Sequence, residues 1–167
     1  MIHYAAYGSN LHPLRLALRA PSSRLLGQGF VAGWSLQFHK RSIDGSGKCN
    51  ILNSGAGTGV YVAVFEMNMK DKMKLDKIEG TGKGYDNATI EVADFGNCFT
   101  YLGTASHIRD ELRPFDWYKE LVLLGCRKLA IPDHYAAVIE SVKSIRDPLE
   151  KRSQAQWKIV ELLRRDT

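Results

Sequence analysis

The sequence YAAYGSNLHP at residues 4–13 predicts a strand, a sharp turn and the start of a helix. The apolar and aromatic residues up to Tyr7 are typical of a short strand over residues 2–7. Glycine, serine and asparagine then favour a turn, after which Asn10 is suited to cap a helix over residues 11–19. Such a turn can aim several backbone N–H groups at one point and so bind a carboxylate or an oxyanion. A plain strand-to-helix connection is the alternative.

Beyond this stretch, the sequence predicts strands first and helices later. Residues 31–39 alternate as in a half-buried strand, and residues 60–65 are apolar on both faces, as in a central strand. Residues 42–48 resemble a polar loop, and Cys49 is also expected in a polar loop. Residues 85–92 and 98–103 suggest a hairpin. Helices are expected over residues 114–129, 133–144 and from about 148 to 165. Strands grouped before helices favour an α+β fold, and the absence of a repeat or linker predicts one domain over residues 1–167.

A short helix is also expected between Asn68, as the N-terminal cap, and Gly80, as the end. Its apolar face would contain Met69, Met73, Leu75 and Ile78. Glu79 then lies at the negative end of the helix dipole, where an ionised carboxylate is disfavoured and proton uptake is favoured. An exposed glutamate at the end of a surface helix is the alternative.

Composition excludes several classes of protein. The 167 residues are 44% hydrophobic and 25% charged, as in ordinary globular chains. The apolar runs are far too short for a membrane-spanning helix, and the first residues lack a secretory leader, which predicts a cytoplasmic location. Neither the three cysteines nor the five histidines have metal-ligand spacing, so no metal is expected.

The net charge of +5 is concentrated in the first 50 residues but forms no dense basic run. A small anionic ligand accounts for this charge, and no nucleic-acid partner is expected. Binding of nucleic acid through this region remains an alternative, which salt-sensitive retention on DNA or RNA would reveal.

Three segments together resemble the γ-glutamylcyclotransferase family, also called AIG2-like. They are YAAYGSNL at residues 4–11, LDKIEG at residues 75–80 and PFDWY at residues 114–118. The resemblance extends over about residues 1–145 and leaves the C-terminal helix outside it. It implies a small mixed β-barrel with flanking helices, and an activity that releases 5-oxoproline from γ-glutamyl compounds without a cofactor.

The resemblance also implies the roles of particular residues. Glu79 is expected to be the catalytic acid and base. The expected substrate-binding residues are Tyr4, Ala5, Ala6, Tyr7, Gly8, Ser9, Asn10, Leu11, Tyr85 and Tyr118. The donor is a γ-glutamyl amino acid or a γ-glutamyl amine. A non-catalytic module of the same fold that binds a small anionic metabolite is the alternative function.

Overall fold

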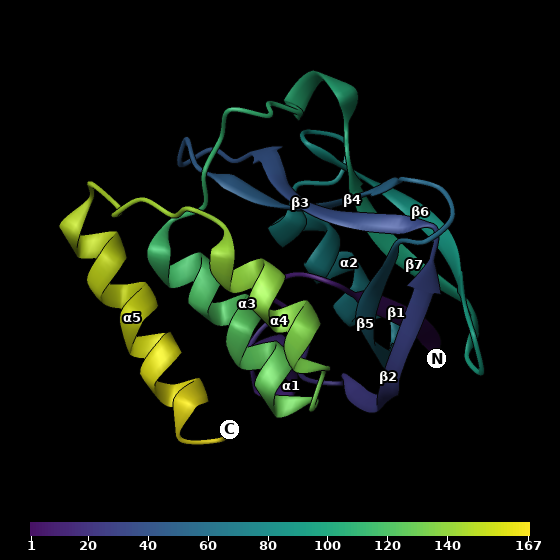
Figure 1. The fold of residues 1–167 in the computed structure, drawn as a ribbon. Helices are drawn as coiled ribbons and strands as arrows, with labels where there is room; N and C mark the ends of the chain where they lie inside the picture. The colour runs from purple at the N-terminus through teal and green to yellow at the C-terminus, as the bar shows by residue number, and fades with distance from the viewer.

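The computed structural model describes residues 1–167 and contains two β-sheets and five α-helices (Figure 1). The strands are β1 (Ile2–Ala6), β2 (Arg24–Ala32), β3 (Trp34–Arg41), β4 (Gly47–Asn53), β5 (Gly59–Met67), β6 (Tyr85–Val92) and β7 (Gly96–Gly103). The α-helices are α1 (Pro13–Ala17), α2 (Met69–Glu79), α3 (Asp116–Lys128), α4 (Asp133–Ser141) and α5 (Glu150–Arg164), and a short 3-10 helix spans Ala105–His107. The α+β fold class predicted from the sequence is confirmed.

The larger sheet has the strand order β2-β5-β1-β7-β6, and β3 pairs with β4 in a second sheet. Only the β1–β7 pair is parallel; the other neighbours are antiparallel. In β5, the residues Val60, Val62, Ala63, Val64 and Phe65 are buried, as the apolar run predicts for a strand covered on both faces. Because β1 lies between β5 and β7, its C-terminal end reaches the middle of the molecule.

The structure does not form a closed barrel. The sheet curls until Val92 and Phe95, at the β6–β7 turn, lie against Gly29 and Gly27 of β2; a Cβ on Gly29 would lie 2.4 Å from Val92 Cγ1. No backbone hydrogen bonds pair β2 with β6, so these two strands are the edges of an open sheet. The resemblance therefore predicted the curvature of the sheet but not its open edges.

Three expectations about the first half of the chain were wrong. The expected strand over residues 31–39 is two strands, because Gly33 takes a φ of 83° and turns the chain back. Cys49 lies on a buried strand, β4, rather than in a polar loop. Helix α1 begins at Pro13 with His12 as its N-cap, so Asn10 does not cap it.

Helix α2 has the predicted ends but a different buried face. The Asn68 side chain accepts from the Asp71 N–H at 2.8 Å, and Gly80 ends the helix with a φ of 72°. Leu75 is buried, whereas Met69, Met73 and Ile78 are at least half exposed. Helix α2 therefore contacts the core along a narrow line, and its last residue, Glu79, is held by contacts beyond the helix.

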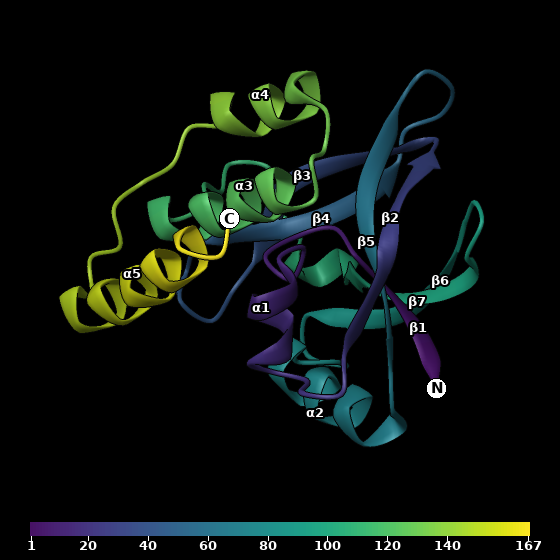
Figure 2. The same cartoon turned by 90° about the horizontal axis from the view of Figure 1, so that it is seen from below.

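Helices α3, α4 and α5 gather on one side of the strands, with α5 outermost (Figure 2). Gly125 lies in the buried centre of α3, where a Cβ would lie 2.4 Å from Leu11 Cβ and 3.0 Å from His12 N. Glycine costs helix stability, but here it lets the segment after β1 press against α3. This packing holds the residues directly after the loop at residues 7–10 against α3.

Asp147 attaches α5 to α3. Its fully buried carboxylate accepts two hydrogen bonds from Arg152, at 2.6 and 2.7 Å, one from Trp117 Nε1 at 3.0 Å and one from Leu149 N at 2.9 Å. Asp147→Ala is expected to lower the free energy of unfolding by about 3 kcal/mol, because Trp117 and Arg152 lose their acceptor. Urea denaturation measures this, with the exposed Asp86→Ala as the control. An equal effect of both substitutions would contradict this account.

The same carboxylate makes stability depend on pH. The hydrogen bonds from Arg152, followed by those from Leu149 and Trp117, lower the pKa of Asp147 to about 2 against burial, which opposes the shift. Because the pKa is lower in the folded state, the stabilisation is complete above about pH 4 and is lost as the pH falls toward 2. Asp147→Ala is expected to flatten the stability profile in that range.

No helix is both long enough and apolar enough to span a bilayer.

Candidate active site

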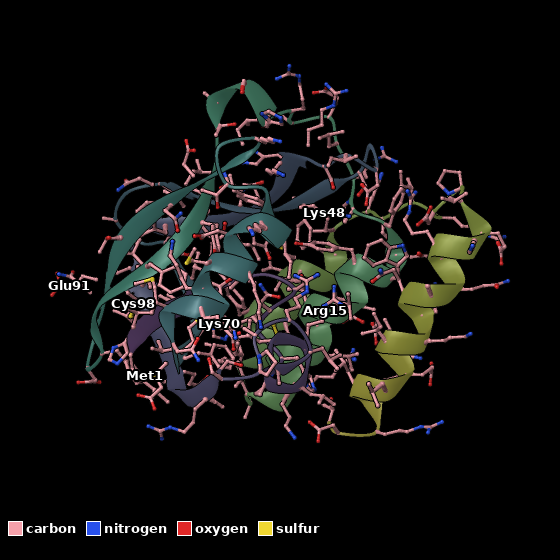
Figure 3. The ribbon with its side chains drawn as sticks, turned by 180° about the vertical axis from the view of Figure 1, so that it is seen from behind. Met1, Arg15, Lys48, Lys70, Glu91 and Cys98 are labelled. Carbon is pink, nitrogen blue, oxygen red and sulfur yellow. The ribbon has the colours of Figure 1, made fainter.

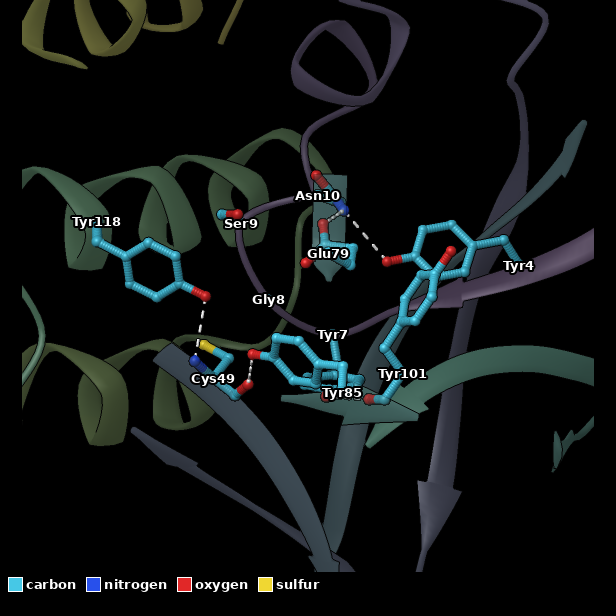
Figure 4. A pocket seen from close by; sticks show the side chains of 10 residues that line it. All are labelled: Tyr4, Tyr7, Gly8, Ser9, Asn10, Cys49, Glu79, Tyr85, Tyr101 and Tyr118. Carbon is cyan, nitrogen blue, oxygen red and sulfur yellow. Dashed lines mark hydrogen bonds between the residues drawn. The ribbon is translucent and has the colours of Figure 1, made fainter. Parts of the chain in front are cut away.

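A cavity of about 300 Å³, counted out to its open mouth, lies where β1, β4, β6, β7, α2 and α3 meet (Figure 4). The lining residues are Tyr4, Tyr7, Gly8, Ser9, Asn10, Cys49, Glu79, Tyr85, Tyr101 and Tyr118. The cavity therefore brings together segments that are far apart in the sequence and combines one carboxylate, five phenol groups and an exposed stretch of backbone.

Most of the residues expected at the site line this cavity. The exceptions are Ala5, Ala6 and Leu11, which are fully buried in the core. Cys49 and Tyr101 also line the cavity, although neither was expected there from the sequence. Tyr101 had a detectable signal, since it alternates along the expected strand over residues 98–103, whereas Cys49 had none while its segment was interpreted as a loop.

Glu79 is held in place by two donors from the first 20 residues. Asn10 Nδ2 and Arg19 Nη1 each donate to Glu79 Oε1 at 3.1 Å. Glu79 Oε2 accepts no hydrogen bond from the protein, and the side chain is 19% exposed. The helix dipole alone would disfavour a carboxylate here, but these two donors stabilise it. One oxygen is thus anchored and the other is free to exchange a proton.

The loop at residues 8–10 offers unused backbone donors. The Leu11 N–H closes the turn by donating to the Gly8 carbonyl at 3.0 Å, but the N–H groups of Gly8, Ser9 and Asn10 make no hydrogen bond within the protein. Ser9 and Asn10 are nevertheless more than nine-tenths buried. Buried backbone N–H groups almost always have partners, so three in succession beside a cavity make a suitable cradle for an anion.

Tyr85 and Tyr118 hold the β4 strand at opposite sides of Cys49 (Figure 4). The Tyr85 hydroxyl donates to the Cys49 carbonyl at 2.5 Å, and the Tyr118 hydroxyl accepts from the Cys49 N–H at 3.1 Å. The Tyr85 hydroxyl proton is therefore already donated within the protein, and the Tyr85 ring forms part of the cavity wall. The Tyr118 hydroxyl lies beside the Cys49 sulfur and can donate its proton there or to a ligand.

The three remaining phenol hydroxyls are each hydrogen-bonded within the protein. The Tyr4 hydroxyl accepts from Asn10 Nδ2 at 3.2 Å, Tyr7 donates to the Tyr101 carbonyl, and Tyr101 donates to Asp76 Oδ1 at 2.8 Å. Burial raises the pKa of Tyr4, and the nearby Glu79 charge raises it further. Burial likewise raises the pKa of Tyr7 and of Tyr101. These groups are neutral at physiological pH and act as hydrogen-bonding walls rather than as bases.

Cys49 is unsuited to be a nucleophile. Its side chain is fully buried, and this burial raises the pKa of the thiol to about 12. The hydrogen bond with Tyr118 lowers the pKa of the thiol but does not offset the effect of burial. The reactive form of cysteine is the thiolate, which is scarce at such a pKa. The cavity therefore favours proton transfer by Glu79 over covalent catalysis.

The surroundings of the cavity are positively charged. Arg15 is 5% exposed and donates no hydrogen bond within the protein (Figure 3). Burial, and then the neighbouring Arg19, lower its pKa to about 9, so it remains protonated near neutrality. Arg15, Arg19 and Lys40 all interact electrostatically with Glu79 or its neighbours. This field attracts an anionic ligand.

A second, larger cavity of about 980 Å³ lies between β3 and α4. Aromatic and aliphatic side chains such as Trp34, Leu36, Tyr61 and Val138 dominate its lining, and it contains no carboxylate. Size alone would favour this cavity, but proton transfer requires an acid or base next to polar anchors. The cavity around Glu79 is therefore the better candidate. No three His, Cys, Asp or Glu side chains gather as metal ligands anywhere in the chain.

Comparisons with known proteins agree with this fold. A family model described as the AIG2-like family matches residues 59–139. The human γ-glutamylcyclotransferase is 27% identical over 149 residues, which cover 84% of this chain and 78% of the human protein. The bovine γ-glutamylcyclotransferase is 27% identical over 146 residues, with the same shares of the two chains.

A solved structure described as a γ-glutamyl cyclotransferase superposes with a TM-score of 0.83 at 26% identity, covering 96% of this chain and 98% of that one. The C-terminal helix, which the sequence resemblance left outside, is thus largely within the shared fold. In sequence and in fold the chain is thus similar to the AIG2-like family and to γ-glutamylcyclotransferases, and these similarities indicate an enzyme of the cyclotransferase type.

Proposed function

We propose that this enzyme releases 5-oxoproline from a γ-glutamyl amino acid or a γ-glutamyl amine, with Glu79 as the group that moves the proton. The observation that carries the proposal is the meeting of one half-anchored carboxylate with three unpartnered backbone N–H groups in a single cavity. The substrate class comes from the relatives, whose names describe γ-glutamylcyclotransferases.

The substrate contains both reacting groups. Its α-amine and its γ-carbonyl belong to one short chain, so binding in a folded conformation brings them together without a second reactant. The enzyme then has to hold that conformation, take a proton from the α-ammonium group and deliver one to the departing amine. The aromatic walls and the open mouth of the cavity favour a compact, folded glutamyl group over an extended one.

In the proposed first step, Glu79 Oε2 accepts a proton from the α-ammonium group, while Oε1 stays bound to Asn10 and Arg19. The free amine attacks the γ-carbonyl carbon and forms a C–N bond, and the carbonyl electrons move to the oxygen. In the second step, the protonated Glu79 gives its proton to the amide nitrogen of the leaving group. The oxyanion re-forms the carbonyl as the original C–N bond breaks. The ring nitrogen gives up its second proton through Glu79 to the departing amine, which leaves as an ammonium ion, and Glu79 returns to the carboxylate.

The loop and Tyr118 supply stabilisation in this scheme. The N–H groups of Gly8, Ser9 and Asn10 hold an anionic group, either the α-carboxylate or the oxyanion of the tetrahedral intermediate. The hydroxyl of Tyr118 lies on the same side of the cavity as Gly8: a Cβ on Gly8 would lie 3.4 Å from it. Tyr118 is thus placed to donate to the same bound group.

The test is product formation from a panel of donors. The purified protein is expected to convert γ-glutamyl-alanine or a γ-glutamyl alkylamine into 5-oxoproline and the free amine, measured by mass spectrometry. The N-acetylated form of each donor must be inert, because acetylation removes the attacking amine. If no donor in the panel yields 5-oxoproline, the proposed function is wrong.

A further inference from the structure

A second polar cavity opens beside Glu79. It measures about 1330 Å³ out to open solvent, and its charged lining residues are Lys40, Arg41, Lys77, Lys83 and Glu79 itself. The serine residues Ser42 and Ser106 also line it, together with His107. We call this cavity the cationic vestibule. Glu79 lines both cavities, so the vestibule adjoins the catalytic cavity at this residue.

Lys40 stands at the boundary between the two cavities. The residue is only 8% exposed, yet its Nζ makes no hydrogen bond or ion pair within the protein and lies 4.1 Å from the centre of the Tyr85 ring. Tyr85 is a wall of the catalytic cavity. Burial lowers the pKa of Lys40, against the attraction of Glu79 and Asp44, which raises it. The stem of Lys40 is buried, whereas its ammonium group keeps some contact with solvent and has no anionic partner within the protein.

The outer part of the vestibule also lacks negative charge. Arg41, Lys77 and Lys83 are exposed at its rim, and none of them donates to a carboxylate of the protein. Glu79 is the only acid in the lining, and its Oε1 already accepts from Arg19. The vestibule therefore combines Lys40 with three outer cations, and none of the four is paired with a carboxylate of the protein.

The direction of the reaction decides which part of the substrate meets these cations. Glu79 delivers a proton to the nitrogen of the leaving amine, so that nitrogen lies beside Glu79 when the bond breaks. In an amino acid, the α-carboxylate is separated from this nitrogen by one carbon. The group that follows the scissile bond is thus the one nearest to Lys40, and a side chain extends farther toward the rim.

We propose that the cationic vestibule binds the leaving group of the donor and selects an acidic amino acid, with Lys40 holding its α-carboxylate and the outer cations its side-chain carboxylate. This inference rests on the proposed function and adds to it the substrate class. The preferred donor is a γ-glutamyl derivative of glutamate or aspartate, and Lys40 is the residue that determines specificity.

Three donors of nearly equal size test this selection. Their leaving groups are glutamate, glutamine and glutaminamide, which carry two, one and no carboxylates. We expect kcat/KM to fall about 3-fold from the first to the second, because the rim cations are exposed. A further fall of roughly 10-fold to 100-fold is expected from the second to the third, because Lys40 is buried. Added salt should reduce the first difference more than the second.

Lys40→Met separates a specificity role from a structural one. The substitution is expected to lower kcat/KM for the γ-glutamyl-glutamine donor at least 10-fold and to leave the glutaminamide donor within about 2-fold. Lys40→Arg should restore much of the loss, since it keeps the charge. Lys70→Met is the matched control: Lys70 lies exposed on α2 (Figure 3) and lines neither cavity, so its loss should change the rate with neither donor.

The outcomes separate this inference from the proposed function. If the wild-type enzyme releases 5-oxoproline equally fast from all three donors, the inference is wrong while the proposed function stands. An equal loss for all donors in Lys40→Met also contradicts it, since that would assign Lys40 a structural role. If none of the donors yields 5-oxoproline, the proposed function itself fails.

Discussion

Glu79→Gln is expected to lower the rate of 5-oxoproline release by on the order of 100-fold to 10,000-fold, the usual cost of losing a positioned acid and base. Glutamine keeps the size of the side chain, and its carbonyl oxygen can still accept from Asn10 Nδ2 and Arg19 Nη1, which both contact Glu79 Oε1. The substitution removes the oxygen that is free to exchange a proton. The loss should therefore appear mainly in kcat.

The control for this experiment is Glu91→Gln. Glu91 lies exposed on β6, has no partner and is not part of either cavity (Figure 3). It should keep the full rate, and both variants should melt near the temperature of the wild-type protein. If the Glu79 variant keeps more than about a tenth of the rate, Glu79 does not move the proton in the proposed mechanism.

Gly8→Ala is expected to lower kcat/KM about 100-fold without unfolding the protein. A Cβ at this position would lie 2.9 Å from Cys49 Cβ and 3.4 Å from both Cys49 Sγ and Tyr118 Oη. The Cβ of Cys49 cannot rotate away, so the loop or β4 has to move. Gly8 does not have a positive φ, so alanine meets no backbone strain there. Displacing reacting groups by about 1 Å is enough to cost 100-fold.

A compensating substitution makes this prediction specific. Cys49→Gly removes the atom that the new methyl group would contact, so the double variant Gly8→Ala with Cys49→Gly should recover activity relative to Gly8→Ala alone. This interaction is measured as a double-mutant cycle in kcat/KM. Additive losses, or full activity of Gly8→Ala, would contradict the close approach of the loop to β4.

Local patterns in the sequence were sufficient for several elements. The apolar run in β5 predicted a central strand, and Asn68 with Gly80 predicted both ends of α2 and hence the position of Glu79. These features depend on neighbours within a few residues, such as a capping side chain or a glycine with positive φ. Caps and runs of this kind are visible without any knowledge of the tertiary structure.

Features that depend on distant partners were not predictable in the same way. Asn10 looked like a helix cap, but its side chain is used by Glu79, which is 69 positions away. The strand β4 contains lysine and asparagine, and Asn50 is buried because its Oδ1 accepts from Gly103 N at 2.7 Å. Such polar residues look loop-like until the partner strand is known.

The residues of the contiguous motif at 4–11 do not all belong to the site. Tyr4 and Tyr7 line the cavity, whereas Ala5, Ala6 and Leu11 pack into the core. Strand alternation alone would place Tyr4 and Tyr7 on opposite faces. Because β1 ends at Ala6, the turn that follows brings Tyr7 to the same cavity as Tyr4. Arg19 carried no motif at all, and only its 3.1 Å contact with Glu79 identifies its place at the site.

The most direct test of the proposed cyclisation uses water labelled with ¹⁸O. The enzyme is incubated with a γ-glutamyl donor, and 5-oxoproline, free amine and glutamate are quantified by mass spectrometry. Attack by the substrate's own α-amine predicts equal amounts of 5-oxoproline and amine, with no ¹⁸O in the 5-oxoproline. Glutamate carrying ¹⁸O in its γ-carboxylate as the first product would show that water is the nucleophile and would contradict the account.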